Sequence, residues 1–296
     1  MSNIFLLLIL LSAIWGSSFF AIKISVESLD PVSVASGRLI IAAVVLYIYF
    51  RIKKLRFNPD LKTIFIIIGI GLLGNFLPFF LISWSEQFIQ SNTTGLLMSV
   101  GPIFALILSH FMTQDQKFSY NKLFAILIGL TGVLFILGFD SLMGLLSNNY
   151  SLIVPKLTVI LAVLGYVISS IFAYNLKKIN IITLTTFVTI SAALISIPFM
   201  LFAEFQNPST ISNKSLTALI YLGLFPTAIA FLIRFHLISK AGPVYLSYVS
   251  YLIPIFAIFW GFIFLGENIS TNSLVGLFFI LIGIYLGQKN IIINKS

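Results

Sequence analysis

Residues 13–23 read AIWGSSFFAIK, and residues 167–175 read VISSIFAYN. Each stretch interrupts a long apolar run with two adjacent serines, which are followed at the same spacing by phenylalanine and alanine. Ser17 in the first stretch stands 152 residues before Ser169 in the second. Two similar stretches at a fixed offset indicate an internal repeat, so we expect the chain to consist of two related halves.

Other matches occur at the same offset of 152 residues. The tetrapeptide PIFA stands at residues 102–105 and again at 254–257. Three single residues also recur in register, with Gly71, Leu72 and Phe79 corresponding to Gly223, Leu224 and Phe231. We therefore predict a first repeat over residues 1–145 and a second repeat over residues 153–296.

Apolar segments long enough to cross a membrane recur along the whole chain. Of its 296 residues, 59% are hydrophobic and only 8% are charged, whereas a soluble domain carries about 25% charged residues. About 20 mainly apolar residues cross the hydrocarbon core of a bilayer. Ten segments meet this requirement, at residues 4–24, 32–50, 63–85, 92–111, 122–139, 156–176, 182–203, 215–237, 243–265 and 273–289. The predicted fold class is an all-α integral membrane protein with ten transmembrane helices.

Each repeat then contains five spans, and an odd number makes the second repeat enter the membrane from the opposite side. This inverted arrangement is typical of secondary transporters, which bind substrate near the midplane between the repeats. With both termini in the cytoplasm, 12 of the 17 Lys and Arg residues fall in cytoplasmic loops and only 2 in outer loops. That bias predicts cytoplasmic N and C termini. It also explains the net charge of +9 without nucleic-acid binding.

Several short motifs stand in a defined order along the spans. WGSSFFAIK lies in the first predicted span, ASGRLIIAA in the second, PIFA in the fourth and ninth, and FLGEN after the ninth. In these features the chain resembles the drug/metabolite transporter superfamily, EamA type, although TQDQ follows the first PIFA where the second copy has FLGEN. The resemblance implies a carrier in the bacterial inner membrane that exports amino acids or other small metabolites. We expect a small-molecule substrate, a surrounding lipid bilayer, and a monomer or homodimer.

Polar, charged and aromatic residues inside or at the ends of the predicted spans are the candidates for substrate binding or gating. Arg38 lies in the second span at a depth of ~9 Å, where a charged group usually faces protein or water. We expect it either to pair with Glu27 or Asp30 or to contact substrate or act as a gate. The complete set of candidates is Trp15, Ser17, Lys23, Arg38, Asn75, Trp84, Asn92, Tyr166, Ser169, Tyr248 and Tyr251.

Other residues have structural interpretations. Pro102 and Pro254 are predicted helix hinges, because a proline frees the carbonyl one turn back. Ser17 and Ser18 are predicted to bond back to the preceding turn and either allow a neighbouring helix to approach or place one hydroxyl in the cavity. Arg234 lies at the predicted cytoplasmic end of the eighth span, so we assign it to snorkelling or to the positive-inside bias.

Absent features limit the function. The chain has no cysteine, which excludes disulfides, thiolate metal sites and cysteine nucleophiles. It contains no GxxxxGK(S/T) phosphate loop, and the GxGxxG match at residues 69–74 lies inside an apolar span. We therefore expect no cofactor and no metal. All eight acidic residues fall in loops or at span ends, which disfavours proton-driven export of organic cations.

The sequence thus predicts a secondary active or facilitative transporter, and more specifically an exporter, of small amphipathic metabolites such as amino acids or their derivatives. Substrate would bind in a central cavity between two inverted repeats that open alternately to either side. Two alternatives remain, namely a membrane sensor or scaffold without transport, and a multidrug or lipid-type exporter. An enzyme is not expected, because two histidines, no cysteine and no clustered acids offer no catalytic constellation.

Overall fold

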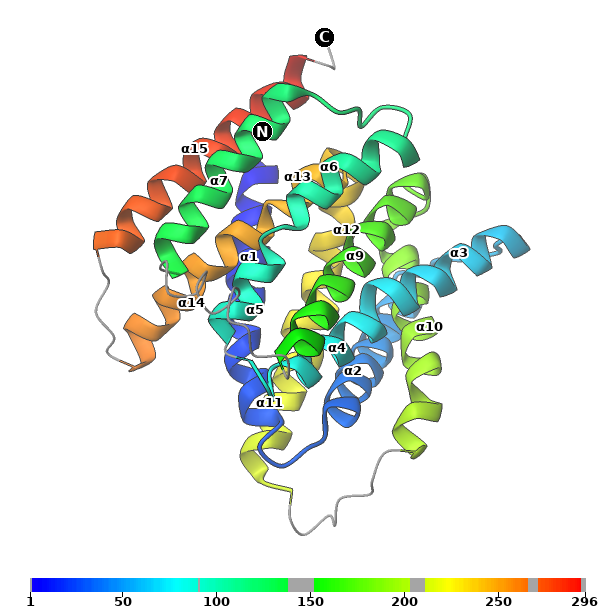
Figure 1. Cartoon of the computed structure of the whole chain (residues 1–296). Coiled ribbons are helices and arrows are strands. Elements are labelled where there is room, and N and C mark those ends of the chain that lie inside the picture. The colour runs from blue at the N-terminus through cyan, green and yellow to red at the C-terminus, as the bar shows by residue number, and fades with distance from the viewer. Residues whose placement is uncertain (1, 90, 138–151, 203–210, 266–270, 294–296) are drawn as a thin grey trace.

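The structure is a computed structural model that describes residues 2–89, 91–137, 152–202, 211–265 and 271–293. Every regular element within these ranges is a helix (Figure 1). Six helical segments are long and apolar enough to cross a membrane, namely Asn3–Ser25, Pro31–Ile52, Leu61–Ser85, Ile153–Asn175, Ile181–Leu201 and Asn213–Ala241. Four apolar helices are shorter, namely Gly101–Met112, Tyr120–Ile136, Pro243–Phe256 and Leu274–Gly287. The predicted boundary between the two repeats lies largely outside the described residues.

Four of these six long segments are uninterrupted helices, namely α1 (Ser2–Ser25), α2 (Pro31–Ile52), α9 (Ile153–Asn175) and α10 (Ile181–Phe202). The start of α2 follows from its sequence, because the carboxylate of Asp30 accepts hydrogen bonds from the amides of Val32 and Ser33 at 2.9 and 3.0 Å. Pro31 needs no backbone donor in this first turn. The cap fixes where α2 begins, and it thereby fixes the position of Arg38 two turns further along.

Two long segments contain a π-helical turn. The first consists of α3 (Leu61–Gly71), η1 (Leu72–Phe76) and α4 (Leu77–Ser85), and the second of α11 (Asn213–Leu222), η4 (Gly223–Ile229) and α12 (Ala230–Ala241). The two turns occupy corresponding positions, since η1 shifted by 152 residues falls within η4. π-Helical turns release backbone carbonyls from the regular α-helical pattern and often mark functional sites.

The local sequence helps to explain the second π-helical turn. Pro226 lies inside η4 and has no amide hydrogen to donate to the carbonyl of Leu222 one turn back. The hydroxyl of Thr227 donates to that carbonyl instead, at 2.7 Å. This bond orients the Thr227 hydroxyl, which leaves its oxygen free to accept a hydrogen bond from another helix.

Two further apolar segments each consist of a short helix followed by a longer one. The first is α5 (Ser91–Met98) with α6 (Gly101–Met112), and the second is α13 (Pro243–Ser247) with α14 (Val249–Leu265). Pro102 lies in the first turn of α6, where a missing amide hydrogen costs nothing, whereas Pro254 lies inside α14. The two predicted hinge prolines therefore occupy different positions in their helices, and their motion stays a prediction.

The two remaining helices, α7 (Tyr120–Leu137) and α15 (Thr271–Ile293), pack side by side (Figure 1). Their backbones approach closely at Gly132 and Gly276, because a Cβ atom on either glycine would lie 2.5 Å from the carbonyl oxygen of the other. Small residues at such a contact are typical of helix pairs in membranes. On α15, Gly283 likewise faces the backbone of α7.

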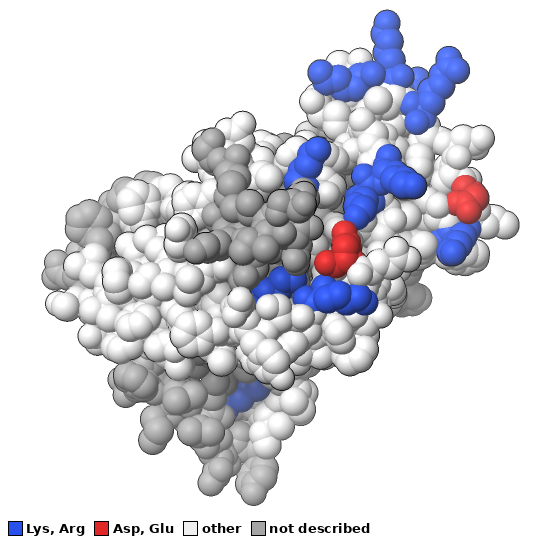
Figure 2. Space-filling model, turned by 90° about the horizontal axis from the view of Figure 1, so that it is seen from above, with Lys and Arg blue, Asp and Glu red and all other residues white. Residues whose placement is uncertain are grey.

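Exposed basic residues occupy several loops and helix ends, namely Arg51, Lys53, Lys54, Arg56, Lys62, Lys117, Lys177, Lys178 and Lys240. Figure 2 shows one face of the molecule on which Lys and Arg side chains gather around few acidic ones. In the described part of these loops one ion pair is present, between Lys177 and Asp115 at 3.4 Å. The other exposed basic groups therefore give these loops a net positive charge.

Candidate functional site

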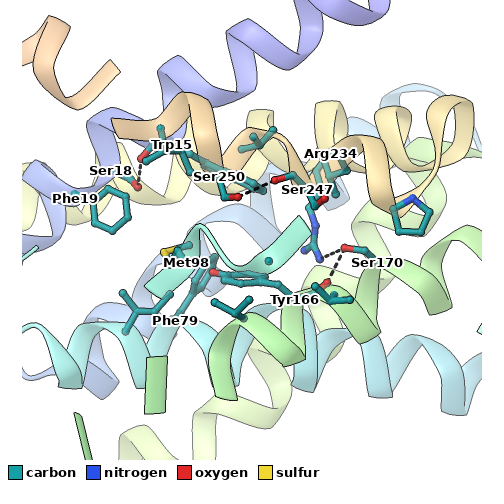
Figure 3. Close-up of a pocket in the computed structure, with 18 of the residues that line it drawn as sticks. Trp15, Ser18, Phe19, Phe79, Met98, Tyr166, Ser170, Arg234, Ser247 and Ser250 are labelled. Carbon is teal, nitrogen blue, oxygen red and sulfur yellow. Dashed lines mark hydrogen bonds between the residues drawn. The ribbon is translucent and has the colours of Figure 1, made fainter. Parts of the chain in front are cut away.

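A cavity of about 120 Å³ lies between helices from both halves of the chain. Its walls are largely aromatic and aliphatic, with Trp15, Phe19, Phe79 and Met98 among the lining residues (Figure 3). Serine hydroxyls, the Tyr166 ring and two arginines interrupt this apolar surface. An apolar cavity with a few convergent polar groups is the usual form of a site for a small molecule.

Corresponding residues of the two halves line this cavity together. We call two residues repeat mates when they lie 152 positions apart. Ten of the 20 lining residues form five such pairs, namely Trp15 and Val167, Ser18 and Ser170, Ile82 and Arg234, Met98 and Ser250, and Gly101 and Ile253. The cavity is thus shared between the halves, and the pair of Ile82 and Arg234 makes its polarity unequal.

Arg234 on α12 is almost completely buried, with 1% of its surface exposed. Its Nη1 donates to the carbonyl of Gly74 at 3.1 Å and to Oδ1 of Asn75 at 3.2 Å. Its Nη2 donates to the hydroxyls of Ser169 at 2.8 Å and Ser170 at 3.3 Å, and Figure 3 shows the guanidinium turned toward Ser170. Four neutral acceptors therefore hold one positive charge in a fixed orientation.

Arg38 on α2 is the second buried cation of the cavity, with 3% of its surface exposed. Its Nε donates to the hydroxyl of Thr227 at 2.9 Å, and its guanidinium stacks 3.9 Å from the centroid of the Phe79 ring. Neither Glu27 nor Asp30 forms an ion pair with it, and the carboxylate of Asp30 caps α2 instead. The expectation that one of these two acids pairs with Arg38 was therefore wrong.

Tyr166 lines the same cavity as the two arginines. Its ring, on α9, has its centroid 5.6 Å from Cζ of Arg234. A tyrosine ring presents a negative face to a cation. No Asp or Glu stands among the described residues that line the cavity, and these described residues contain no cluster of acids or histidines that would hold a metal ion.

The sequence matches the EamA-like transporter family twice, over residues 3–138 and over residues 155–287. The chain belongs to this family. It is a multi-pass membrane protein of the transporter type, and the two matches cover one half of the chain each. The family therefore agrees with the resemblance that the motifs of the sequence indicate.

Curated relatives of this EamA-like chain cover nearly its whole length. "Uncharacterized transporter YoaV" of Bacillus subtilis (strain 168) is 27% identical over 293 residues, 97% of each chain. A "S-adenosylmethionine/S-adenosylhomocysteine transporter" of Chlamydia muridarum (strain MoPn / Nigg) is 23% identical over 286 residues, which cover 93% of this chain and 89% of that protein. One crystal structure has a TM-score of 0.79 at 16% identity, covering 97% of this chain and 98% of that one, and shows similarity of fold alone.

In this EamA-like chain, three of the candidate residues line the cavity, namely Trp15, Arg38 and Tyr166. Asn75 and Ser169 lie just behind it and hold Arg234. The indole nitrogen of Trp15 donates to the carbonyl of Pro226 in η4 at 3.0 Å, so α1 is tied to the second half of the chain.

The two serines of the first stretch have different neighbours. Both hydroxyls donate to carbonyls of the preceding turn, as predicted, with Ser17 bonded to Ile14 at 2.8 Å and Ser18 bonded to Trp15 at 2.6 Å. Ser18 lines the cavity, whereas the hydroxyl of Ser17 lies 2.5 Å from that of Tyr221 and joins α1 to α11. One serine thus faces the cavity and the other mediates helix packing.

The other candidates lie away from the cavity. Lys23 is exposed, Trp84 packs against Phe88 with ring centroids 4.8 Å apart, and the side chain of Asn92 lies outside the described residues. Tyr248 and Tyr251 are buried between helices, because Tyr251 donates to the carbonyl of Ile126 on α7 and Tyr248 packs against Gly287 on α15. Their apolar rings fill a helix interface rather than the cavity wall.

Arg234 is the charged residue of the cavity wall that the sequence interpretation misplaced. The assignment to the cytoplasmic end of a span was wrong, because α12 continues to Ala241 and buries Arg234. Seven residues of helix correspond to ~10 Å, so Arg234 lies well inside. The signal in the sequence was Gly242 and Pro243, which end the helix and place Lys240 rather than Arg234 at its exposed end.

Proposed function

We propose that the chain is a secondary active or facilitative transporter that exports small amphipathic metabolites, such as amino acids or their derivatives. The observation that carries this proposal is the cavity lined by five pairs of repeat mates and by two buried arginines. Membrane proteins rarely bury a charged side chain unless it serves a pathway, a substrate or a partner. Relatives named as transporters support the same activity and give no support to an enzyme.

Transport would proceed by alternating access between two inverted repeats of five spans each, over residues 1–145 and 153–296. The stacking of Phe79 on its own repeat mate Phe231, with ring centroids 5.9 Å apart, supports this arrangement. Two corresponding residues touch when both lie near the axis that relates the repeats. Exchange of conformation between the repeats would then open the cavity to one side while it closes the other.

The orientation in the membrane follows from the charged loops. We place the N and C termini and the basic face of Figure 2 in the cytoplasm, with the chain in the bacterial inner membrane as a monomer or homodimer. The beginning of α1 and the end of α15 lie toward the same side of the molecule in Figure 1. A chain that crosses a membrane an even number of times has both ends on the same side, so this position of the helix ends agrees with ten spans.

Counterflow into liposomes tests the proposed activity. Purified protein is reconstituted, and uptake of amino acids, their N-acyl derivatives and S-adenosylmethionine is compared with uptake into protein-free liposomes. Ser250→Trp fills the cavity and is expected to abolish uptake, whereas the matched control Thr131→Trp adds the same side chain at an exposed position of α7. Uptake of none of these compounds by the intact protein would contradict the carrier function and favour a sensor or scaffold.

A further inference from the structure

We infer that the substrate is an organic anion, that its oxyanion group binds to Arg38, and that its apolar body lies against the aromatic wall of the cavity. This inference rests on the proposed function, because it names the substrate class of the same cavity.

The free hydrogen-bond donors of Arg38 are the first argument. A guanidinium carries five N–H groups, one on Nε and four on the two terminal nitrogens. Within the described part of the chain only Nε has an acceptor, the hydroxyl of Thr227. The terminal nitrogens form a planar fork in a residue that is 3% exposed and lines the cavity. Such a fork matches the two oxygens of a carboxylate.

Arg234 differs from Arg38 in this respect. Its two terminal nitrogens have four acceptors within hydrogen-bond distance, one for each of their four N–H groups. It therefore offers no free terminal donor to a ligand. Its contribution is a fixed positive charge in the cavity wall, which favours an anion without donating a terminal N–H group to it.

The uncompensated charge of the cavity is the second argument. Both guanidinium groups are buried, and neither has a carboxylate within 4.0 Å among the described residues, whose ion pair lies in the loops between Lys177 and Asp115. A buried charge is costly unless an opposite charge and hydrogen bonds compensate it. A bound anion would supply both, so the charge of the cavity wall favours a negatively charged ligand.

The remaining walls define the rest of the substrate. Trp15, Phe79 and Met98 present apolar surface, and no Asp or Glu among the described lining residues is available to accept an ammonium group. A zwitterion would therefore bind more weakly than an anion of the same shape, and a cation more weakly still. An N-acylated amino acid fits this description better than the free amino acid.

A panel that varies only the head group tests the inference in wild-type protein. Uptake into liposomes is measured by mass spectrometry for N-acetylphenylalanine (anion), phenylalanine (zwitterion), N-acetylphenylalaninamide (neutral) and phenylalaninamide (cation), with uptake by protein-free liposomes subtracted. The same four head groups are measured on leucine and methionine bodies. We expect the anion to enter fastest on at least one body, and at least about tenfold faster than its neutral amide.

The outcomes of the panel are distinct. Uptake of the amides as fast as the anions would overturn the inference and leave the carrier function intact. Uptake of the free amino acids faster than their N-acetyl forms on every body would also overturn it, because the extra ammonium should weaken binding. Uptake of no compound at all would overturn the carrier function and this inference with it.

Substitutions then test the role of Arg38. Arg38→Gln is expected to lower uptake of the anion about tenfold and to bring it close to that of the neutral amide. Arg38→Lys keeps the charge but not the fork, so it should restore part of the preference for the anion. The control is Arg51→Gln, an exposed position near the end of α2 that should change nothing. An unchanged preference in both Arg38 variants would contradict binding at Arg38, and if Arg38→Gln does not fold, the lysine variant decides.

Discussion

Arg234 and Asn75 lie 159 residues apart in the sequence, and their side chains meet with 3.2 Å between Nη1 and Oδ1. Thr227, the repeat mate of Asn75, receives a hydrogen bond from Arg38 at 2.9 Å. At corresponding positions of the two π-helical turns, one side chain therefore accepts a hydrogen bond from a buried arginine on another helix. Because the turns belong to different halves of the chain, both contacts couple the halves beside the cavity.

The first prediction concerns the threonine of η4. Thr227→Val keeps the shape of the side chain but removes the donor to Leu222 and the acceptor for Arg38. We expect a loss of about 1–3 kcal/mol in the free energy of unfolding and slower transport, since buried polar groups lose their partners. Denaturant unfolding in detergent measures the first effect and counterflow the second.

The matched control for this variant is Thr217→Val. Thr217 is exposed on α11, and among the described residues its hydroxyl bonds only to the carbonyl of Asn213 four residues earlier. Equal stability and equal transport of the two variants would mean that the bond between α2 and η4 has no role.

The second prediction separates two neighbouring tyrosines. The hydroxyl of Tyr251 donates to the carbonyl of Ile126 at 3.0 Å, whereas the buried hydroxyl of Tyr248 has no partner among the described residues. Tyr251→Phe should cost about 0.5–1.5 kcal/mol of stability, and Tyr248→Phe should be neutral or stabilising. Neither variant should change the apparent affinity for substrate, because neither ring lines the cavity. A lower affinity for substrate in the Tyr248→Phe variant would show that Tyr248 contributes to substrate binding.

The third prediction tests the packing of α7. A Cβ atom on Gly129 would lie 2.5 Å from Cε2 of Tyr251, whereas no described atom outside the local helix backbone lies within 4 Å of the same atom on Gly69. Gly129→Ala should therefore destabilise the protein by about 1–3 kcal/mol, and Gly69→Ala should have little effect. Thermal unfolding of both variants gives the comparison, and a stable Gly129→Ala protein would contradict the close contact between α7 and α14.

The fourth prediction concerns pH. Burial raises the pKa of the Glu86 carboxyl from 4.5 to about 7, while Lys23 opposes this shift. Glu86 follows the end of α4, and its Oε1 atom has no hydrogen-bond partner among the described residues. Between these two pKa values the native protein binds more protons than the unfolded chain, so stability is highest at low pH and falls as the pH rises toward 7.

Thermal unfolding from about pH 5 to about pH 7.5 measures this dependence. Glu86→Gln should flatten the curve, whereas Glu27→Gln, at an exposed carboxylate, should leave it unchanged. A curve of the same slope in wild type and in Glu86→Gln would assign the pH dependence to another group.

The helical segments could be predicted from the sequence because length and hydropathy decide which residues enter a membrane. Turn residues and charges mark the ends of these segments, and Asp30 with Pro31 illustrates such a signal. The π-helical turns were not predicted, because they follow from proline placement and from contacts between halves, such as the bond from Arg38 to Thr227. Periodicity in a single apolar segment does not contain this information.

The candidate site could be predicted only in part. Polar residues in apolar segments are candidates on chemical grounds. This criterion correctly selected Arg38 and Tyr166, which line the cavity. The direction in which a side chain points depends on how helices pack. The sequence therefore made Tyr248 and Tyr251 candidates on the same grounds as Tyr166, although both fill a helix interface. Arg234 was misplaced because a span end a few residues too early moves a buried charge to the surface.

Alternating access requires that one cavity between the two halves opens to both sides of the membrane in turn. The chain has no cysteine, so Ser18→Cys on α1 and Ser250→Cys on α14 each provide a single thiol in the cavity wall. A membrane-impermeant thiol reagent is applied to one side of sealed vesicles and then, in separate vesicles, to the other. Each thiol is expected to react from either side, and transported substrate is expected to slow both reactions. Reaction from one side alone, unaffected by substrate, would contradict alternating access.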